Sequence, residues 1–116
     1  NKYQYNLVRP ISYIRDVMHV ESWNSFISTP AHPEYPSAHS SLSFAAANIL
    51  EKFFPNVHNF TDNTNNFLNL APRTYANIHA IAVDAGMSRL YGGIHFRQSL
   101  QVSEVQANKV TANILK

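Results

Sequence analysis

The clearest pattern along the chain is a series of apolar residues spaced by three and four positions between residues 37 and 54. This spacing places the apolar side chains on one face of an α-helix. The stripe consists of Leu42, Ala45, Ala46, Ile49, Leu50, Phe53 and Phe54. Prolines at positions 30, 33 and 36 keep the preceding segment extended, and Pro55 ends the pattern. We therefore predict a helix over 37–54 that is entered from a proline-rich extended segment.

Three other segments carry shorter or weaker helical patterns. Residues 10–18 begin with Pro10, which suits a first helical position, and residues 22–28 either continue this helix or form a separate turn. Two later helices are predicted over 74–90, ended by two glycines, and over 99–115. The stripe of the first is Tyr75, Ile78, Ile81, Ala82, Ala85 and Leu90, and that of the second is Val102, Val105, Val110 and Ile114. Because no segment alternates usefully between apolar and polar positions, the predicted fold class is all-α, as part of a helical bundle.

Composition narrows the possible classes of protein. The 116 residues fit one domain, and 45% hydrophobic residues are too many for a disordered chain. No apolar run is long enough for a membrane span, and the absence of cysteine excludes disulfides and thiolate metal sites. A net charge of +2 without a Lys/Arg cluster gives no reason to expect nucleic acid as a partner. Only 14% of the residues are charged, against about 25% in typical domains, which predicts that part of the surface is normally covered.

Residues with suitable chemistry lie at the junctions between the predicted helices. They are Lys2 and Arg9 before the first helix, Ser37, Ala38 and His39 at the start of the second, and Arg89 and His95 around the turn after the third. A helix N-terminus and cationic side chains bind tetrahedral oxyanions, while histidines coordinate metals, attack phosphorus or transfer protons. Taken singly, each residue has an ordinary interpretation, such as a solvated cation or, for Ser37, a helix N-cap. Taken together, they indicate a phosphate-like oxyanion site with two histidines.

The order and spacing of these residues resemble the vanadium-dependent haloperoxidases and the related PAP2-type acid phosphatases. The motifs of that superfamily are K-x6-R-P, P-S-G-H and S-R-x5-H-x3-D. In this chain they correspond to residues 2–10, to Pro36-Ser37-Ala38-His39, and to the segment from Ser88-Arg89 to His95. The resemblance runs from Lys2 to about Ser99. It implies the helical bundle of that superfamily, and specifically a C-terminal part of it that spans residues 1–116.

The chain departs from the motifs at two positions. Ala38 replaces the usual glycine but keeps the backbone N–H that the resemblance assigns to oxyanion binding. Ser99 stands where the third motif has aspartate, which in the phosphatases orients the nucleophilic histidine. Its loss weakens the case for a phosphohistidine mechanism, whereas coordination of vanadium by His95 remains possible. A backbone carbonyl or a water would then have to fix the imidazole ring.

The resemblance implies a role for each matching residue. His95 would coordinate vanadium or attack phosphorus, and His39 would be the acid–base. The side chains expected to bind the oxygens of vanadate, or of phosphate in the same site, are those of Lys2, Arg9, Ser37 and Arg89, together with the Ala38 N–H. Lys2 would also polarise bound peroxide. His32, five positions before Ser37, stands where the family's bromoperoxidases have histidine and its chloroperoxidases have phenylalanine; otherwise it is a loop histidine without a role.

Other polar residues are expected to be structural. Glu34 is predicted at the rim of the site, with Tyr35 packing beside it. His19, His58 and His79 have no partners at metal-ligand spacing, and Asp62 is expected to make an Asx-turn in an asparagine-rich loop.

Three functions remain open at this stage. The first is a vanadate-dependent haloperoxidase that oxidises bromide or iodide, rather than chloride, with hydrogen peroxide. The second is a PAP2-type acid phosphatase acting on phosphomonoesters, and the third is a catalytically degenerate member. The resemblance also favours a secreted or periplasmic protein and allows a homo-oligomer. The low charge predicts that apolar faces of this chain are covered by a missing N-terminal part of the same protein or by another copy.

Overall fold

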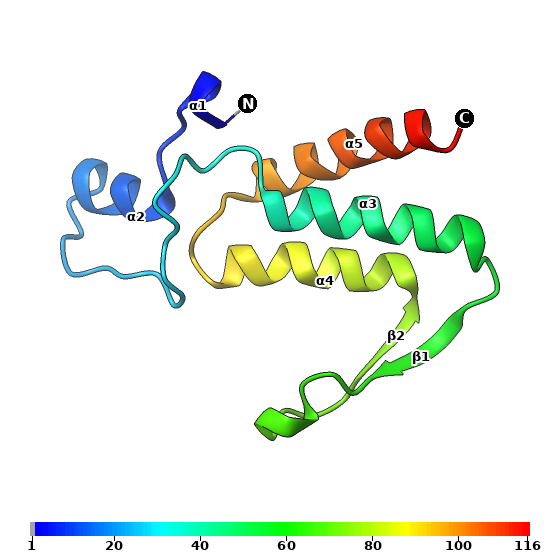
Figure 1. Ribbon diagram of the computed structural model, residues 1–116. Coiled ribbons are helices and arrows are strands. Elements are labelled where there is room, and N and C mark those ends of the chain that lie inside the picture. Colours follow the sequence, from blue (N-terminus) through cyan, green and yellow to red (C-terminus); the bar gives the residue numbers. More distant parts are fainter. Residues whose placement is uncertain (1) are drawn as a thin grey trace.

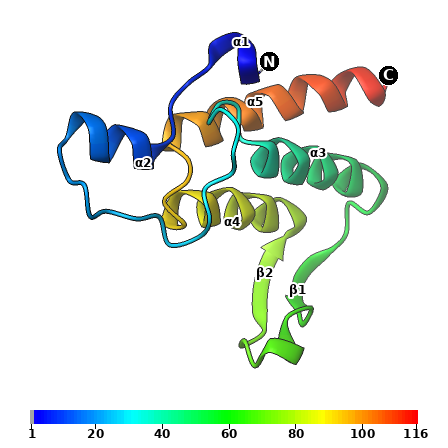
Figure 2. The same cartoon turned by 60° about the vertical axis from the view of Figure 1, so that its left-hand side comes forward.

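The computed structural model describes residues 2–116, and three long helices form most of it (Figure 1). Helix α3 (Ala38–Phe53) packs against both α4 (Ile78–Tyr91) and α5 (Arg97–Ile114), whereas α4 and α5 contact each other much less. The views in Figures 1 and 2 agree in placing α3 beside both partners. The predicted class, a mostly helical bundle, is confirmed. No helix within residues 2–116 combines the length and apolarity that crossing a bilayer requires.

The N-terminal segment lies at one end of these helices (Figure 2). It contains the short helices α1 (Lys2–Tyr5) and α2 (Pro10–Ser12), and α2 continues directly into the π-helical turn η1 (Tyr13–Val17). The prediction of a short helix at 10–18 is therefore confirmed, while residues 22–28 form turns and bends rather than a helix. From there the chain runs back through the proline-rich segment to the start of α3.

The boundaries of α3 follow the sequence signals closely. Ser37 is the N-cap, and its Oγ accepts a hydrogen bond from the N–H of Ser40 at 3.4 Å. The helix ends at Phe53, just before Pro55, as predicted. At the other end of the bundle, α4 stops at Tyr91, and Gly93 adopts a φ of +75° in the turn that follows. A tight turn thus separates α4 from the segment that carries His95.

A two-stranded antiparallel hairpin between α3 and α4 corrects the expectation that the chain has no strands. Strands β1 (His58–Asp62) and β2 (Arg73–Asn77) pair with Phe60 opposite Tyr75, and a 3-10 turn, η2 (Asn66–Leu68), lies in the connection. Residues 74–77 therefore belong to a strand, not to the third helix, which begins at Ile78 after the N-cap Asn77. The predicted Asx-turn is present, because the Thr64 N–H donates to Asp62 Oδ1 at 2.8 Å.

The predicted apolar stripe of α4 faces the core, because Ala82 is 1% exposed and Ile78 packs beside it, but α5 and most of α3 bury other faces than predicted. Leu42 and Phe53 of the α3 stripe are 71% and 67% exposed, and Val105 of the α5 stripe is 52% exposed. The residues that α3 and α5 bury instead are Ser40, Phe44, Ala47, Ser99, Leu100, Ser103, Ala107 and Thr111. Small side chains on these faces let the helix axes approach, since a Cβ added to Gly86 of α4 would lie 3.1 Å from Ser40 Oγ. The predicted stripe of α5 and most of that of α3 consequently point away from the three-helix core, with Ala45 of α3 as an exception.

Candidate oxyanion site

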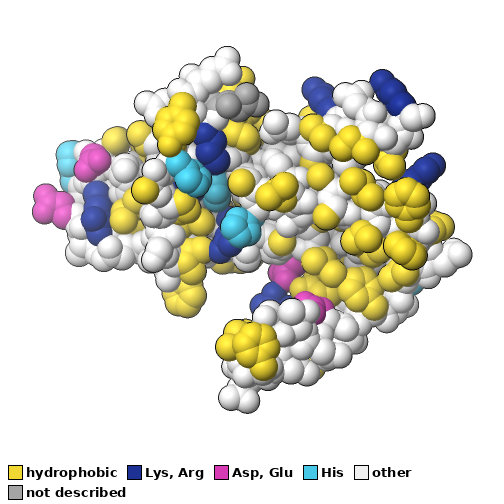
Figure 3. Space-filling view, viewed as in Figure 1, with side chains coloured by type: hydrophobic (Ala, Val, Ile, Leu, Met, Phe, Trp, Pro, Cys, Tyr) yellow, Lys and Arg dark blue, Asp and Glu magenta, His cyan; other side chains and the backbone are white. Residues whose placement is uncertain are grey.

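Four segments meet where α3 begins. They are the loop before α2, the proline-rich segment before α3, the first turn of α3, and the last turn of α4 with the loop into α5. In the space-filling view, histidine and cationic side chains gather at the junction between the N-terminal segment and the helices (Figure 3). All eight residues predicted from the motifs lie on these segments or on α1: Lys2, Arg9, His32, Ser37, Ala38, His39, Arg89 and His95.

Arg9 connects the two sides of this junction. It is only 6% exposed, and its Nη1 lies 2.7 Å from the Ile94 carbonyl oxygen and 3.1 Å from His95 Nε2. Its Nε and Nη2 reach the carbonyl oxygen and Nδ1 of His32, at 3.1 Å and 3.0 Å. Because a guanidinium only donates hydrogen bonds, His95 Nε2 accepts here and carries no proton, whereas His32 Nδ1 lies between Arg9 Nη2 and the Pro33 carbonyl oxygen, at 3.0 Å and 3.1 Å. Arg9 therefore holds both imidazole rings with a defined nitrogen facing it.

His95 is buried between Arg9 and a carboxylate. Its Nδ1 donates to Glu34 Oε1 at 2.6 Å, which fixes the tautomer with Nε2 unprotonated. Burial lowers the pKa of His95, and the charges of Arg9 and Lys2 lower it further, against the opposing effect of Glu34. The ring is thus neutral near pH 7. A neutral, oriented imidazole is the form that coordinates a metal or attacks an electrophile.

Glu34 was predicted at the rim of the site, and this prediction is wrong. Its side chain is completely buried, and it accepts hydrogen bonds from His95, from the Phe96 N–H at 3.1 Å and from Ser99 Oγ at 2.6 Å. Burial raises the pKa of this carboxyl, but the three hydrogen bonds outweigh burial and lower it overall. Glu34 is therefore an ionised carboxylate inside the site. Tyr35 packs as predicted, edge to face against Tyr5 at 5.0 Å between ring centroids.

Sequence reasoning missed this role of Glu34, although one signal pointed to it. A glutamate between prolines in a loop normally faces solvent. However, serine at position 99 left His95 without its motif carboxylate, and the chain has only seven acidic residues. One of them stands three positions before the motif serine Ser37. A search for a replacement carboxylate near the other motifs would have found it.

Lys2, at the start of α1, packs its side chain against the proline-rich segment. Its Nζ donates to the carbonyl oxygens of Pro33, Glu34 and Pro36 at 3.1, 3.1 and 2.6 Å, which uses all three N–H groups of the ammonium. Burial lowers the pKa of Lys2, as does the nearby charge of Arg9. In this arrangement, Lys2 fixes the segment that carries Glu34 and adds positive charge around His95.

The start of α3 and the end of α4 contribute the remaining residues. Ser37 is completely buried, whereas Ala38 and His39 are exposed in the first turn of α3. Burial lowers the pKa of His39, and the charge of Arg89 lowers it further. The Nε of Arg89 is buried and has no hydrogen-bond partner among the described residues. A buried N–H of a cation without an acceptor is unfavourable, and an oxyanion would satisfy it.

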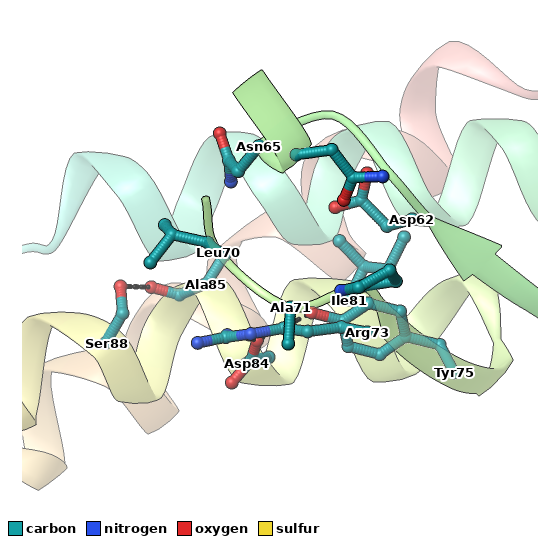
Figure 4. Close-up of a pocket in the computed structure, with 12 residues that line it drawn as sticks. Asp62, Asn65, Leu70, Ala71, Arg73, Tyr75, Ile81, Asp84, Ala85 and Ser88 are labelled. Carbon is teal, nitrogen blue, oxygen red and sulfur yellow. Dashed lines mark hydrogen bonds and ion pairs between the residues drawn. The ribbon is translucent and has the colours of Figure 1, made fainter. Parts of the chain in front are cut away.

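A separate pocket of about 450 Å³ lies between the hairpin and α4 (Figure 4). Asp62, Arg73, Tyr75 and Asp84 line it, and Arg73 and Tyr75 both donate to Asp84. None of the eight predicted site residues lines this pocket. The oxyanion site and the hairpin pocket are therefore different features of the molecule.

The comparisons with known proteins give the family and the fold of the chain. A profile of the VCPO second helical-bundle domain matches residues 1–116. The chain belongs to that family, within the vanadium haloperoxidase superfamily. Among solved structures, it is similar to the first bacterial vanadium-dependent iodoperoxidase, with a TM-score of 0.89 and 34% identity over 98% of this chain. No curated protein matches it significantly.

Two further structures share the fold of this family member. They are the holo and apo forms of a bacterial vanadium-dependent chloroperoxidase, with TM-scores of 0.78 and 0.79, identities of 20% and 19%, and coverage of 96% and 91% of this chain. The chain spans 28% of the length of the iodoperoxidase and 30% and 29% of the two chloroperoxidase chains.

Proposed function

We propose that this chain carries the oxyanion site of a vanadate-dependent haloperoxidase that oxidises iodide or bromide with hydrogen peroxide. The observation that carries the proposal is the state of His95. Its Nδ1 donates to a buried carboxylate, and its unprotonated Nε2 lies 3.1 Å from the Arg9 guanidinium. A neutral imidazole nitrogen beside a fixed cation supports the binding of a metal in oxyanion form.

The residues present fit vanadate. Arg89 offers a buried N–H without a partner, Arg9 offers a guanidinium beside His95, and the start of α3 offers the Ala38 N–H. Among the described residues there is no group of three or more histidine or acidic side chains able to hold a bare cation. A single imidazole surrounded by hydrogen-bond donors suits an oxyanion better than a metal cation.

In the proposed reaction, vanadate supplies Lewis-acid activation of hydrogen peroxide. Arg9, Arg89 and the α3 N-terminus would bind its anionic oxygens, and His95 would hold it through Nε2 in place of the present contact with Arg9. His39, exposed in the first turn of α3, would act as the acid–base that accepts the proton of hydrogen peroxide and gives it to the departing oxygen. The balanced change is halide, hydrogen peroxide and one proton to hypohalous acid and water. The halide loses two electrons, and the peroxide bond accepts them.

The preference for iodide or bromide rests on two supports. His32 occupies the position five residues before Ser37, and Arg9 holds its ring by a contact of 3.0 Å. A polar, hydrogen-bonded ring at this position differs from the phenylalanine expected in chloroperoxidases. In addition, the solved structure with 34% identity belongs to an iodoperoxidase.

The apolar outer faces of α3 and α5 need a cover in this proposal. Exposed Leu42, Leu50 and Val105 lie on these faces, and Figure 3 shows hydrophobic atoms spread over them. The hydrophobic effect favours burying such a surface. We infer that other helices of the same protein cover it, or alternatively a second copy of the chain.

The experiment measures halide oxidation by the full-length protein with hydrogen peroxide, with and without vanadate, for iodide, bromide and chloride separately. We expect vanadate-dependent oxidation of iodide and bromide that exceeds oxidation of chloride. Halide oxidation that is absent, or that does not depend on vanadate, contradicts the proposal.

A second candidate function, phosphomonoester hydrolysis, is favoured by one specific observation. The argument against it was the missing motif aspartate, but Glu34 gives His95 the carboxylate partner that a nucleophilic histidine uses. Hydrolysis of a chromogenic phosphate ester, inhibited by vanadate and without halide oxidation, would select the phosphatase. Binding of vanadate or phosphate without either activity would indicate a catalytically degenerate member.

A further inference from the structure

Glu34 and His95 come from distant parts of the chain and form a tightly bound pair. They are 61 positions apart, and their side chains are 0% and 4% exposed. Glu34 Oε1 accepts from the His95 ring and from the Phe96 backbone, while Oε2 accepts from Ser99 Oγ. Three donors from the same turn therefore fix both oxygens of one carboxylate. Such a carboxylate has little freedom to turn away from His95.

Ser99 occupies the motif position for aspartate and instead anchors the carboxylate of Glu34. Its own carbonyl oxygen accepts from Ser103 Oγ at 2.6 Å, and Ser103 Oγ accepts from the Ser37 N–H at 2.9 Å. Ser99 and Ser103 are four positions apart on α5, so they lie on one face of the helix. Two small hydroxyl side chains thus attach both ends of segment 34–37 to α5.

We propose that Glu34 is the positioning residue for His95 and replaces the aspartate absent from position 99. The carboxylate has moved from α5 to the loop before α3, and serine at position 99 provides the space and the hydrogen bond for it. Glu34 holds the proton on His95 Nδ1 and thereby keeps Nε2 unprotonated, as the acceptor that faces Arg9. The use of this arrangement for vanadate rests on the proposed function, but the arrangement itself does not.

The first test moves the carboxylate back to the helix. In the full-length protein, Glu34→Ala removes it, and Glu34→Ala combined with Ser99→Asp supplies one from the motif position. The matched control is Glu34→Ala with Ser99→Asn, which has the same shape without the charge. Vanadate affinity is measured by equilibrium dialysis. We expect Glu34→Ala to weaken binding about 10- to 100-fold, as for other partners of metal-bound histidines, and only the aspartate to restore most of it.

The second test observes the histidine without any ligand. In protein free of vanadate, the ¹⁵N shifts of the His95 ring report which nitrogen carries the proton. We expect a proton on Nδ1 in the native protein and in the aspartate rescue, and a mixture of tautomers in Glu34→Ala. Glu34→Gln, which keeps the side-chain volume, covers the case in which Glu34→Ala fails to fold. With this variant we expect weaker vanadate binding at unchanged melting temperature.

Two results would overturn the proposal. One is equal rescue of vanadate affinity by aspartate and asparagine, because a role in packing alone predicts this. The other is an Nδ1 proton on His95 that is unaffected by loss of Glu34. A native protein that binds vanadate but oxidises no halide would refute the proposed function and leave the positioning role intact. If vanadate does not bind at all, the ¹⁵N measurement still decides the role of Glu34.

Discussion

At the end of the bundle where α3 begins, the buried side chains are polar, whereas along the outer faces of α3 and α5 the exposed side chains are apolar. Arg9, Glu34, Ser37 and His95 are each at most 6% exposed, while Leu42 is 71% exposed. Ordinary domains show the opposite distribution. A buried cluster of charged and hydroxyl side chains beside exposed apolar helix faces is the contrast that the proposed oxyanion site and the proposed cover by further protein would explain.

The largest expected effect is the loss of His95 at the polar end. His95→Ala removes the proposed vanadium ligand, and we expect halide oxidation by the full-length protein to fall by about three orders of magnitude. His58→Ala, which changes an exposed histidine on β1, is the matched control and leaves activity unchanged. Full activity of the His95 variant would show that the polar interior serves only folding.

The next largest effect is on the free energy of unfolding, after truncation of an apolar side chain on the outer face of α3. In the full-length protein, Leu42→Ala should cost about 3 kcal/mol in free energy of unfolding if the face is covered, because a buried leucine is truncated. Lys52→Ala, on the same helix, should change it by less than about 0.5 kcal/mol. Chemical denaturation measures both. Equal, small effects would mean that Leu42 stays in water and that the contrast between the two regions has another origin.

A smaller effect, on the affinity for oxyanions, tests the role of the Arg89 Nε, which has no hydrogen-bond partner among the described residues. Arg89→Gln removes the guanidinium whose Nε is buried, and we expect vanadate and phosphate to bind about 10- to 100-fold more weakly. Arg73→Gln, in which a cation bound to Asp84 on the hairpin side is lost, provides the comparison. If both substitutions weaken oxyanion binding equally, the effect reflects overall charge and not a site at the polar end.

The smallest expected effect is a change in the pKa of His39. Burial and then the charge of Arg89 hold its pKa below the usual 6.5, so that its ring is mostly neutral at that pH. Replacement of Arg89 by glutamine removes the second cause, and the pKa should rise toward 6.5 without reaching it, because burial remains. An NMR titration of the His39 ring in ligand-free protein measures this shift. An unchanged or lower pKa would show that Arg89 does not face His39.

The sequence predicted features that depend on local chemistry. The proline-rich entry, the Ser37 cap and Pro55 located α3 to within about one residue, because caps and prolines act on their own neighbours. The spacing of the three motifs predicted which residues converge at the start of α3. The family comparison supports the fold that these motifs implied, while the role of each residue remains a prediction.

Features that depend on distant partners escaped prediction. The β1–β2 hairpin has no fully buried residue, so its stability comes from cross-strand pairs such as Thr61 with Thr74 and Phe60 with Tyr75, and it needs no long alternation of apolar residues. The direction in which α3 turns its apolar stripe depends on which neighbours are present. Glu34 is buried only because three donors more than 60 positions away in sequence surround it.

The long separations within the site also bear on how the protein folds. Arg9 and His95 are 86 positions apart, and Glu34 and Ser99 are 65 apart. Closing such large loops costs entropy before any contact compensates for it, so contacts of this kind form late on a folding pathway. A chain whose helices have formed but whose ends have not docked has no complete oxyanion site. If the proposed site binds an oxyanion, that binding would therefore require that the whole chain has reached its native topology.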